Sequence, residues 1–167
     1  MECILFRHGI ADAPKDWRGD DALRPLTPDG KKKTRNAAAG LVHLEMSPTQ
    51  VWSSPLTRAV QTAELIRQTL LMPEDIRVLD ELRSDAPPEL LLALLREMPP
   101  DACLICVGHE PHLGSLASLM LFGKSNGGLS LKKAGACLIR FDERPRAGRG
   151  SLVWWLMPSQ LRSLAKA

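Results

Sequence analysis

The sequence predicts a three-layer α/β/α fold, in which helices cover both faces of a mostly parallel sheet that has an antiparallel edge. Strand-like apolar runs alternate with helical patterns along most of the chain, as in parallel βαβ units. Residues 102–107 are continuously apolar, which is typical of a strand covered on both faces. Residues 136–141 and 151–157 are joined by a Gly-, Arg- and Pro-rich connection and predict an antiparallel pair.

The first half of the chain predicts two strands that are each followed by a helix. Residues 3–6 predict a buried strand, and residues 12–24 have no periodicity and predict a loop. Thr27 is expected to cap a helix that begins at Pro28 and runs to about Leu44.

A second strand is expected at residues 50–53. Ser54 and Pro55 then predict the cap and first position of the next helix, which places Arg58 in its first turn. The remaining elements are a strand at 76–82, a helix at 89–98, a strand at 102–107, a helix at 112–122, the antiparallel pair and a terminal helix at 159–165.

Size and composition limit the classes of function. The 167 residues are expected to form one domain, residues 1–167, with a core that needs neither metals nor disulfides. A net charge of +3 suits an anionic substrate, but it is too weak to indicate nucleic acid, and 4% aromatic residues offer few base-stacking surfaces. No apolar run is long enough to span a membrane, and the chain starts directly in a strand, so we expect a soluble, cytoplasmic protein.

Cys103 and Cys106 form a Cys-x-x-Cys pattern, which in other contexts indicates redox chemistry or zinc. Both lie inside a predicted buried strand, and no second pair with ligand spacing accompanies them. We therefore expect them to be core residues, like Cys3 and Cys137 in similar apolar strands.

Cations and imidazoles stand at the ends of three predicted strands. Arg7 and His8 follow the first strand, Arg58 opens the helix after the second, and His109 follows the strand at 102–107. Ligands bind at this carboxyl edge in open α/β sheets. A guanidinium is a planar donor fork suited to phosphate, and a neutral imidazole can attack phosphorus. The pattern predicts a phosphate site in which the two guanidiniums lower the pKa of His8.

These segments resemble the histidine phosphatase superfamily, which has the phosphoglycerate mutase-like fold. The matching segments are Leu5-Phe6-Arg7-His8-Gly9, Arg24-Pro25-Leu26-Thr27, residues 54–63 beginning Ser54-Pro55-Leu56-Thr57-Arg58, and Val107-Gly108-His109-Glu110-Pro111. The short length and the terminal Trp154-Trp155-Leu156-Met157-Pro158 resemble the small SixA-type phosphohistidine phosphatases.

The resemblance implies that His8 is the nucleophile and forms a covalent phosphohistidine, and that Arg7, Arg58 and His109 line the phosphate pocket. Larger relatives place a Glu after the third strand in a Leu-x-Glu context, which makes Glu81 the first candidate for the general acid. Glu110 is the second candidate, by analogy with the acid phosphatase branch, and Asp20 and Asp21 are more remote ones. The long insertion that covers the site in mutases has no counterpart in this chain, so an open groove is implied.

An open groove suits a phosphorylated side chain on another protein better than a small sugar phosphate. The expected activity is removal of the phosphoryl group from phosphohistidine, for example in an HPt-type phosphorelay domain in signal transduction. The alternatives are a phosphatase of small phosphomonoesters and a non-catalytic phosphate-binding module. A metal phosphatase is disfavoured because no carboxylate cluster accompanies the histidines. We expect a monomer that uses no metal or other cofactor.

Overall fold

The computed structural model describes residues 1–44 and 46–166 and has a six-stranded sheet at its centre. The strands lie in the order β3-β2-β4-β1-β5-β6. Strands β1 to β4 pair in parallel, whereas β5 runs antiparallel to β1 and to β6. Their bounds are β1 Glu2–Arg7, β2 Gln50–Ser53, β3 Arg77–Val78, β4 Cys103–Gly108, β5 Ala136–Arg140 and β6 Ser151–Leu156. The mostly parallel sheet and its antiparallel edge are confirmed.

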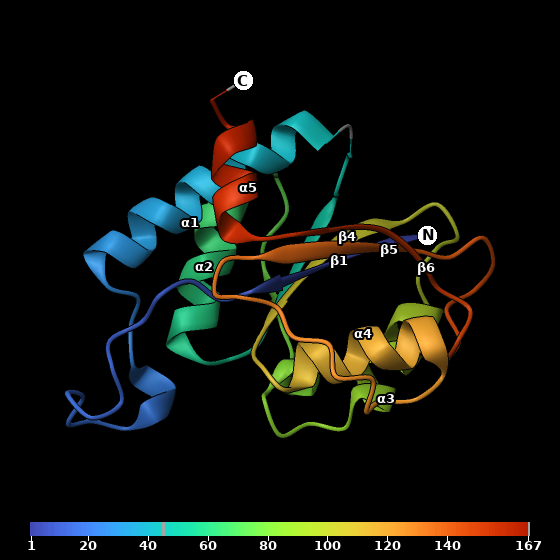
Figure 1. The fold of residues 1–167 in the computed structure, drawn as a ribbon, viewed down its shortest axis with the longest axis horizontal. Helices are drawn as coiled ribbons and strands as arrows, with labels where there is room; N and C mark the ends of the chain where they lie inside the picture. The colour runs from blue at the N-terminus through green and yellow to red at the C-terminus, as the bar shows by residue number, and fades with distance from the viewer. Residues whose placement is uncertain (45, 167) are drawn as a thin grey trace.

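Helices cover both faces of this sheet (Figure 1). The α-helices are α1 Pro28–Leu41, α2 Thr57–Thr69, α3 Pro88–Arg96, α4 His112–Phe122 and α5 Pro158–Leu164. Short 3-10 helices are η1 Asp21–Leu23, η2 Val42–Leu44 and η3 Asp80–Leu82. Helices α1, α2 and α5 pack on one face and α3 and α4 on the other. Within residues 1–44 and 46–166, no helix has the length and apolar character needed to cross a bilayer.

The two cores meet at β1, because successive residues of a strand point to opposite faces of the sheet. Ile4 and Phe6 pack against the layer of α1, α2 and α5, whereas Cys3 and Leu5 pack against α3 and α4. All four side chains are fully buried. The strand that leads to His8 is therefore held from both sides.

The cysteines at 3, 103, 106 and 137 are free and buried, which confirms that they are core residues.

The third strand is shorter than the predicted 76–82. Only Arg77 and Val78 pair with β2, and the chain then turns into η3. Both residues are exposed because β3 lies at the edge of the sheet, whereas Leu82 turns inward and is fully buried. The apolar pattern that predicted a strand comes partly from this core side chain in η3.

Helix α2 begins at Thr57, later than the predicted start at Pro55. The backbone N–H of Ser54 donates to the carbonyl of Val107, which continues the pairing of β2 with β4 past Ser53. The N-cap is Leu56, which makes no side-chain capping bond. Ser54 is therefore not the N-cap, and its hydroxyl is free for a different role. Arg58 does lie in the first turn, as predicted.

Candidate functional site

Neighbouring strands bring the predicted histidines together at the carboxyl edge of the sheet. β1 and β4 pair in parallel up to Arg7 and Gly108, so His8 and His109 leave adjacent strands at the same level. The ring centroids of these two histidines lie 4.9 Å apart. Both side chains are buried, with 6% and 2% exposure. Arg58 reaches the same edge from the first turn of α2, because β2 is the other neighbour of β4.

The ring of His8 is oriented by its own turn. Nδ1 lies 2.7 Å from the carbonyl oxygen of Gly9. A carbonyl only accepts hydrogen bonds, so Nδ1 carries the proton and Nε2 keeps its lone pair. The backbone N–H of Gly9 in turn donates to the hydroxyl of Thr62, which donates to the carbonyl of Arg58. Helix α2 thus holds the turn that contains the imidazole.

Burial lowers the pKa of His8 to about 3, with smaller contributions from the charges of Arg58, Arg7 and Lys133. The hydrogen bond to Gly9 acts in the opposite direction. The prediction that the guanidiniums lower the pKa of His8 is confirmed in direction, but burial is the larger cause. The neutral imidazole, which is the nucleophilic form, is therefore maintained throughout the physiological pH range.

The ring of His109 is oriented by a contact with the hydroxyl of Ser54. Its Nε2 lies 2.8 Å from the Ser54 hydroxyl oxygen, which also accepts the N–H of Leu56. In the tautomer in which the Ser54 hydroxyl donates to Nε2, the ring proton of His109 is on Nδ1. Burial lowers the pKa of His109 to about 3, and His8 and Arg58 add to the effect.

The two arginines are each anchored from outside the site. Arg58 donates from Nη1 to the Asp21 carbonyl at 2.8 Å and from Nη2 to the Asp21 carboxylate at 3.0 Å. Asp21 is held in turn by Nε of Arg24 at 2.8 Å, and Arg24 is tied to the carbonyl of Asp12. Arg7 donates from Nη1 to the carbonyl of Leu131 at 2.7 Å.

These anchors leave some buried donors unpaired. Within residues 1–44 and 46–166, Nε of Arg7, Nε of Arg58 and Nδ1 of His109 are buried and have no hydrogen-bond partner. A buried polar group without a partner costs about 1–3 kcal/mol, so such groups call for an explanation. All three groups belong to the surroundings of His8, because the His109 ring lies 4.9 Å from it and the charges of Arg58 and Arg7 act on it. The arrangement is suited to binding a tetrahedral anion next to a nucleophile.

The candidate acids differ in their surroundings. Asp21 is ion-paired, and its hydrogen bond from Arg24 lowers the pKa of its carboxyl, so it is a poor proton donor. Asp20 accepts the N–H of Ala22 and caps η1. Both carboxylate oxygens of Glu110 accept backbone N–H groups. Glu81 lies in η3, half-buried, and η3 runs beside the end of β4, where the carbonyl of Leu82 faces Gly108. Glu81 remains the predicted acid.

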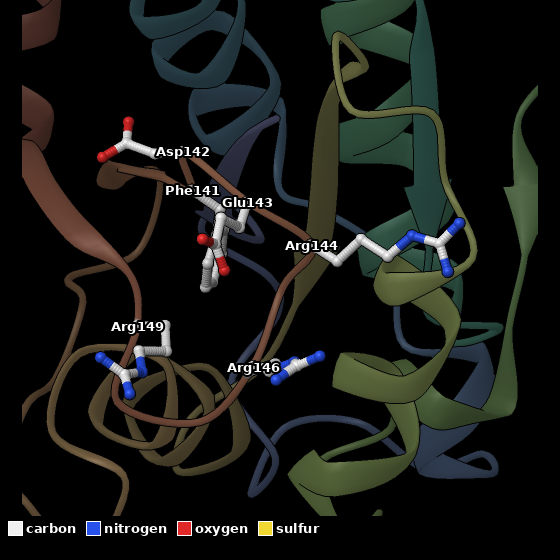
Figure 2. Close-up of a pocket in the computed structure, with 6 residues that line it drawn as sticks. All are labelled: Phe141, Asp142, Glu143, Arg144, Arg146 and Arg149. Atoms are coloured by element: carbon white, nitrogen blue, oxygen red, sulfur yellow. The ribbon is translucent and has the colours of Figure 1, made fainter.

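A separate hollow of about 350 Å³ lies at the other end of the sheet. Figure 2 shows its lining residues: Phe141, Asp142, Glu143, Arg144, Arg146 and Arg149. β5 is antiparallel to β1, so Arg140 faces Glu2, whereas Ala136 faces Phe6 near the histidines. The loop that follows Arg140 is therefore at the amino end of β1. In the part of the chain that the structure describes, no group of three His, Cys, Asp or Glu residues is placed to hold a metal ion.

Sequence reasoning missed the residues that orient the site. Ser54 was assigned to a helix cap, and Thr62 and Leu131 carried no signal of their own. The sequence does not show that Asp21, a residue of the predicted loop and a remote candidate acid, anchors Arg58. Its spacing of three residues from Arg24 was the one available sign of an ion pair.

The fold and this grouping of imidazoles and guanidiniums define the class of protein. The chain belongs to the histidine phosphatase superfamily (branch 1), whose model matches residues 3–84. An uncharacterised protein of Picosynechococcus sp. is 39% identical over 142 residues, which cover 84% of this chain and 85% of that protein. The phosphohistidine phosphatase SixA of Escherichia coli is 29% identical over 169 residues, covering 100% of this chain and 99% of SixA.

The fold is shared with a solved structure, the protein histidine phosphatase SixA complexed with tungstate. The TM-score is 0.85 at 27% identity, and the match covers 96% of this chain and 99% of that chain. The chain is therefore a SixA-like hydrolase of the histidine phosphatase superfamily, which confirms the predicted resemblance and fold.

The buried histidines predict how stability varies with pH. The pKa is lowered to about 3 for His8 and His109 and to about 4 for His112, which is buried at the start of α4, in each case mainly by burial. In the unfolded chain their pKa is near 6.5, so below that pH the unfolded state binds protons that the folded state does not. The free energy of unfolding is expected to fall between about pH 6.5 and pH 4, by up to about 1.4 kcal/mol per pH unit for each histidine.

Urea denaturation across this range measures the effect. His112→Gln is expected to reduce the slope of the free energy of unfolding against pH by the amount that corresponds to about one bound proton. A free energy of unfolding that is constant from about pH 6.5 to pH 4 would contradict the burial of neutral imidazoles.

Proposed function

We propose that this chain is a metal-independent phosphatase that removes the phosphoryl group from phosphohistidine in a partner protein. The observation that carries the proposal is a buried, neutral imidazole at His8, with the His109 ring 4.9 Å away and the charges of Arg58 and Arg7 acting on it. A phosphoryl group in transfer spreads its charge over three oxygens, so donors placed in advance supply most of the catalysis.

The chemistry proceeds in two displacements. Nε2 of His8 attacks phosphorus, a new N–P bond forms, and the N–P bond to the substrate imidazole breaks. Water then attacks the phosphohistidine, releasing inorganic phosphate and restoring neutral His8. Arg7, Arg58 and His109 hold the phosphoryl oxygens throughout, which keeps the phosphorus in line with Nε2.

The leaving group decides how much acid catalysis the reaction needs. A substrate imidazole protonated near pH ~6.5 leaves as a neutral ring. An alkoxide leaves only with a proton donor, and general acids contribute roughly 10²–10⁴-fold. Asp21 is held as a carboxylate and Glu110 accepts hydrogen bonds at both oxygens. A phosphoramidate would therefore be hydrolysed without help from these two carboxyls, whereas an alkyl ester would need a proton from Glu81, the predicted acid.

The comparisons support the same substrate class. The relative from Escherichia coli is a phosphohistidine phosphatase, and the solved SixA structure is complexed with tungstate, a tetrahedral oxyanion like phosphate. By this likeness the substrate is a phosphoprotein.

A substrate panel tests the proposal. Initial rates are compared for a phosphohistidine-bearing HPt domain, a phosphohistidine peptide, an aryl phosphate and an alkyl phosphate, each with and without chelator. We expect the highest kcat/KM with phosphohistidine, unchanged by chelator. A preference for the alkyl phosphate would indicate a phosphomonoesterase, and loss of activity with chelator would contradict the metal-independent chemistry.

Glu81→Gln measures the need for an acid. If Glu81 donates the proton, we expect this variant to lose about 10²-fold or more on the alkyl phosphate and little on the phosphohistidine peptide. Glu97→Gln serves as the control, because Glu97 is an exposed glutamate at the end of α3. Equal losses by Glu81→Gln on both substrates would refute the leaving-group argument.

A further inference from the structure

The carboxylate of Glu110 is folded back onto the protein backbone. One oxygen accepts the N–H of Leu131 at 2.7 Å, and the other accepts the N–H of Gly114 at 3.2 Å. Gly114 lies in the first turn of α4, whereas Leu131 lies in the segment that follows α4 and leads to β5. Glu110 therefore ties this segment to the helix that begins beside His109.

The residue that Glu110 holds also holds Arg7. The carbonyl of Leu131 accepts Nη1 of Arg7 at 2.7 Å, and the Leu131 side chain is fully buried. The N–H and the C=O of this one residue thus connect a carboxylate to a guanidinium. Arg7 ends β1 and pairs with Gly108, and Glu110 follows β4 by two residues, so Leu131 links the carboxyl ends of the two strands.

The two oxygens of the Glu110 carboxylate are both engaged by backbone N–H groups. Burial raises the pKa of its carboxyl, and the hydrogen bonds from Leu131 and Gly114 oppose that shift. Protonation would replace one of the two acceptor oxygens by a donor and break a hydrogen bond to the backbone. The pKa of the carboxyl is raised overall, so what favours a positioning role is the geometry: both oxygens already accept hydrogen bonds from the backbone.

The segment that Leu131 belongs to has no regular secondary structure, and it packs on α4 where the Leu129 carbonyl faces Gly114. Residues 124–130 contain neither helix nor strand, and most of them are exposed. Further along, the N–H of Ala134 lies 3.0 Å from the Arg7 carbonyl and 3.2 Å from the His8 carbonyl. Those bonds and the buried Leu131 side chain hold the main chain near His8. The Glu110 contact adds a hydrogen bond to the N–H of the residue whose carbonyl binds Arg7.

We propose that Glu110 is a positioning residue, which places the Arg7 guanidinium through the backbone of Leu131 and transfers no proton. The proposal rests on the proposed function only in that Arg7 binds the phosphoryl group, whichever substrate carries it. A displacement of about 1 Å in such a contact can cost about 10²-fold in rate. The sequence pointed to Glu110 as an acid only because it adjoins His109.

A double-mutant cycle tests whether Glu110 affects the rate through Arg7. Glu110→Gln keeps the size of the side chain but replaces one acceptor oxygen by a donor, and we expect kcat/KM to fall about 10–100-fold. In an Arg7→Ala background the same change is expected to cost about twofold or less, because its target is absent. Equal losses in the two backgrounds would overturn the proposal.

A series of leaving groups separates positioning from acid catalysis. For a positioning residue the fractional loss in Glu110→Gln is the same on phosphohistidine peptide, aryl phosphate and alkyl phosphate. A loss that grows with the pKa of the leaving group would make Glu110 the acid and refute the proposal. Glu110→Asp adds a second test, because it keeps an acidic group but shortens the reach to Leu131 and Gly114. We expect it to resemble Glu110→Gln.

Binding of orthovanadate, a tetrahedral oxyanion like phosphate, tests the positioning of Arg7 without reference to any substrate. We expect Glu110→Gln to weaken vanadate binding about tenfold, as measured by calorimetry, whereas Glu97→Gln leaves it unchanged. Thermal denaturation and near-ultraviolet circular dichroism verify the fold. Should Glu110→Gln not fold, Glu110→Asp carries the cycle. Unchanged vanadate affinity in a folded variant contradicts the proposal, whereas low phosphohistidine activity in the wild type contradicts only the proposed function.

Discussion

Replacing His8 by Ala is expected to reduce turnover by about 10⁴-fold or more, because the group that forms the covalent intermediate is gone. Acid-labile phosphate should be trapped on the wild-type chain by rapid quenching and should be missing from His8→Ala. The expected site is Nε2, since Nδ1 donates to the Gly9 carbonyl. Mass spectrometry under alkaline conditions locates the phosphate.

His43→Ala is the matched control, since His43 is an exposed histidine in η2. It is expected to keep full activity and full phosphorylation. Binding of vanadate by His8→Ala should persist, because the donors of Arg7, Arg58 and His109 remain. Phosphate trapped on a different residue, or a fully active His8→Ala, would contradict the assignment of the nucleophile.

Arg58→Ala is expected to lower kcat/KM by about 10²–10³-fold by removing a buried cation from the phosphoryl oxygens. Arg58→Lys keeps the charge, but a single ammonium cannot both bind Asp21 through two bonds and face the phosphoryl group. We expect an intermediate loss, about tenfold. Steady-state kinetics together with vanadate affinity measures both effects.

Arg67→Ala is the control on the same helix, because Arg67 lies in the last turn of α2 and contacts only Glu64 among the described ion pairs. It is expected to be active. An Arg58→Ala variant with normal vanadate affinity would show that the guanidinium binds no anion.

The sequence predicted the sheet, and the candidate residues at its carboxyl edge, because both follow from local patterns. Continuous apolar runs identify strands buried on both faces, and the motif residues Arg7, His8 and His109 directly follow such runs. The exact start of α2 was wrong, since Ser54 and Pro55 look like a cap in isolation. Only the packed structure shows that the Ser54 hydroxyl is engaged by His109, a residue far along the chain.

Orientation and electrostatics depended on the tertiary structure. The tautomer of His8 follows from the Gly9 carbonyl, and the main cause of its low pKa is burial, which a sequence does not reveal. The sequence also does not show what anchors the arginines. Arg58 binds the carboxylate of Asp21, and Arg7 binds the main-chain carbonyl of Leu131, which lies far along the chain. Sequence motifs predicted the candidate reacting groups, while long-range contacts determine how they are held.

The pairing of β1 with β4 has a consequence for how the protein acquires its activity. Glu2 aligns with Cys103 and Phe6 with Val107, so the strand that leads to His8 has no neighbour until a distant part of the chain arrives. On the other side its neighbour is β5, which lies still further along. Contacts of such long sequence separation form slowly, since the intervening chain must first be brought together. Catalytic competence should therefore appear late in folding, together with the closing of the sheet around its first strand.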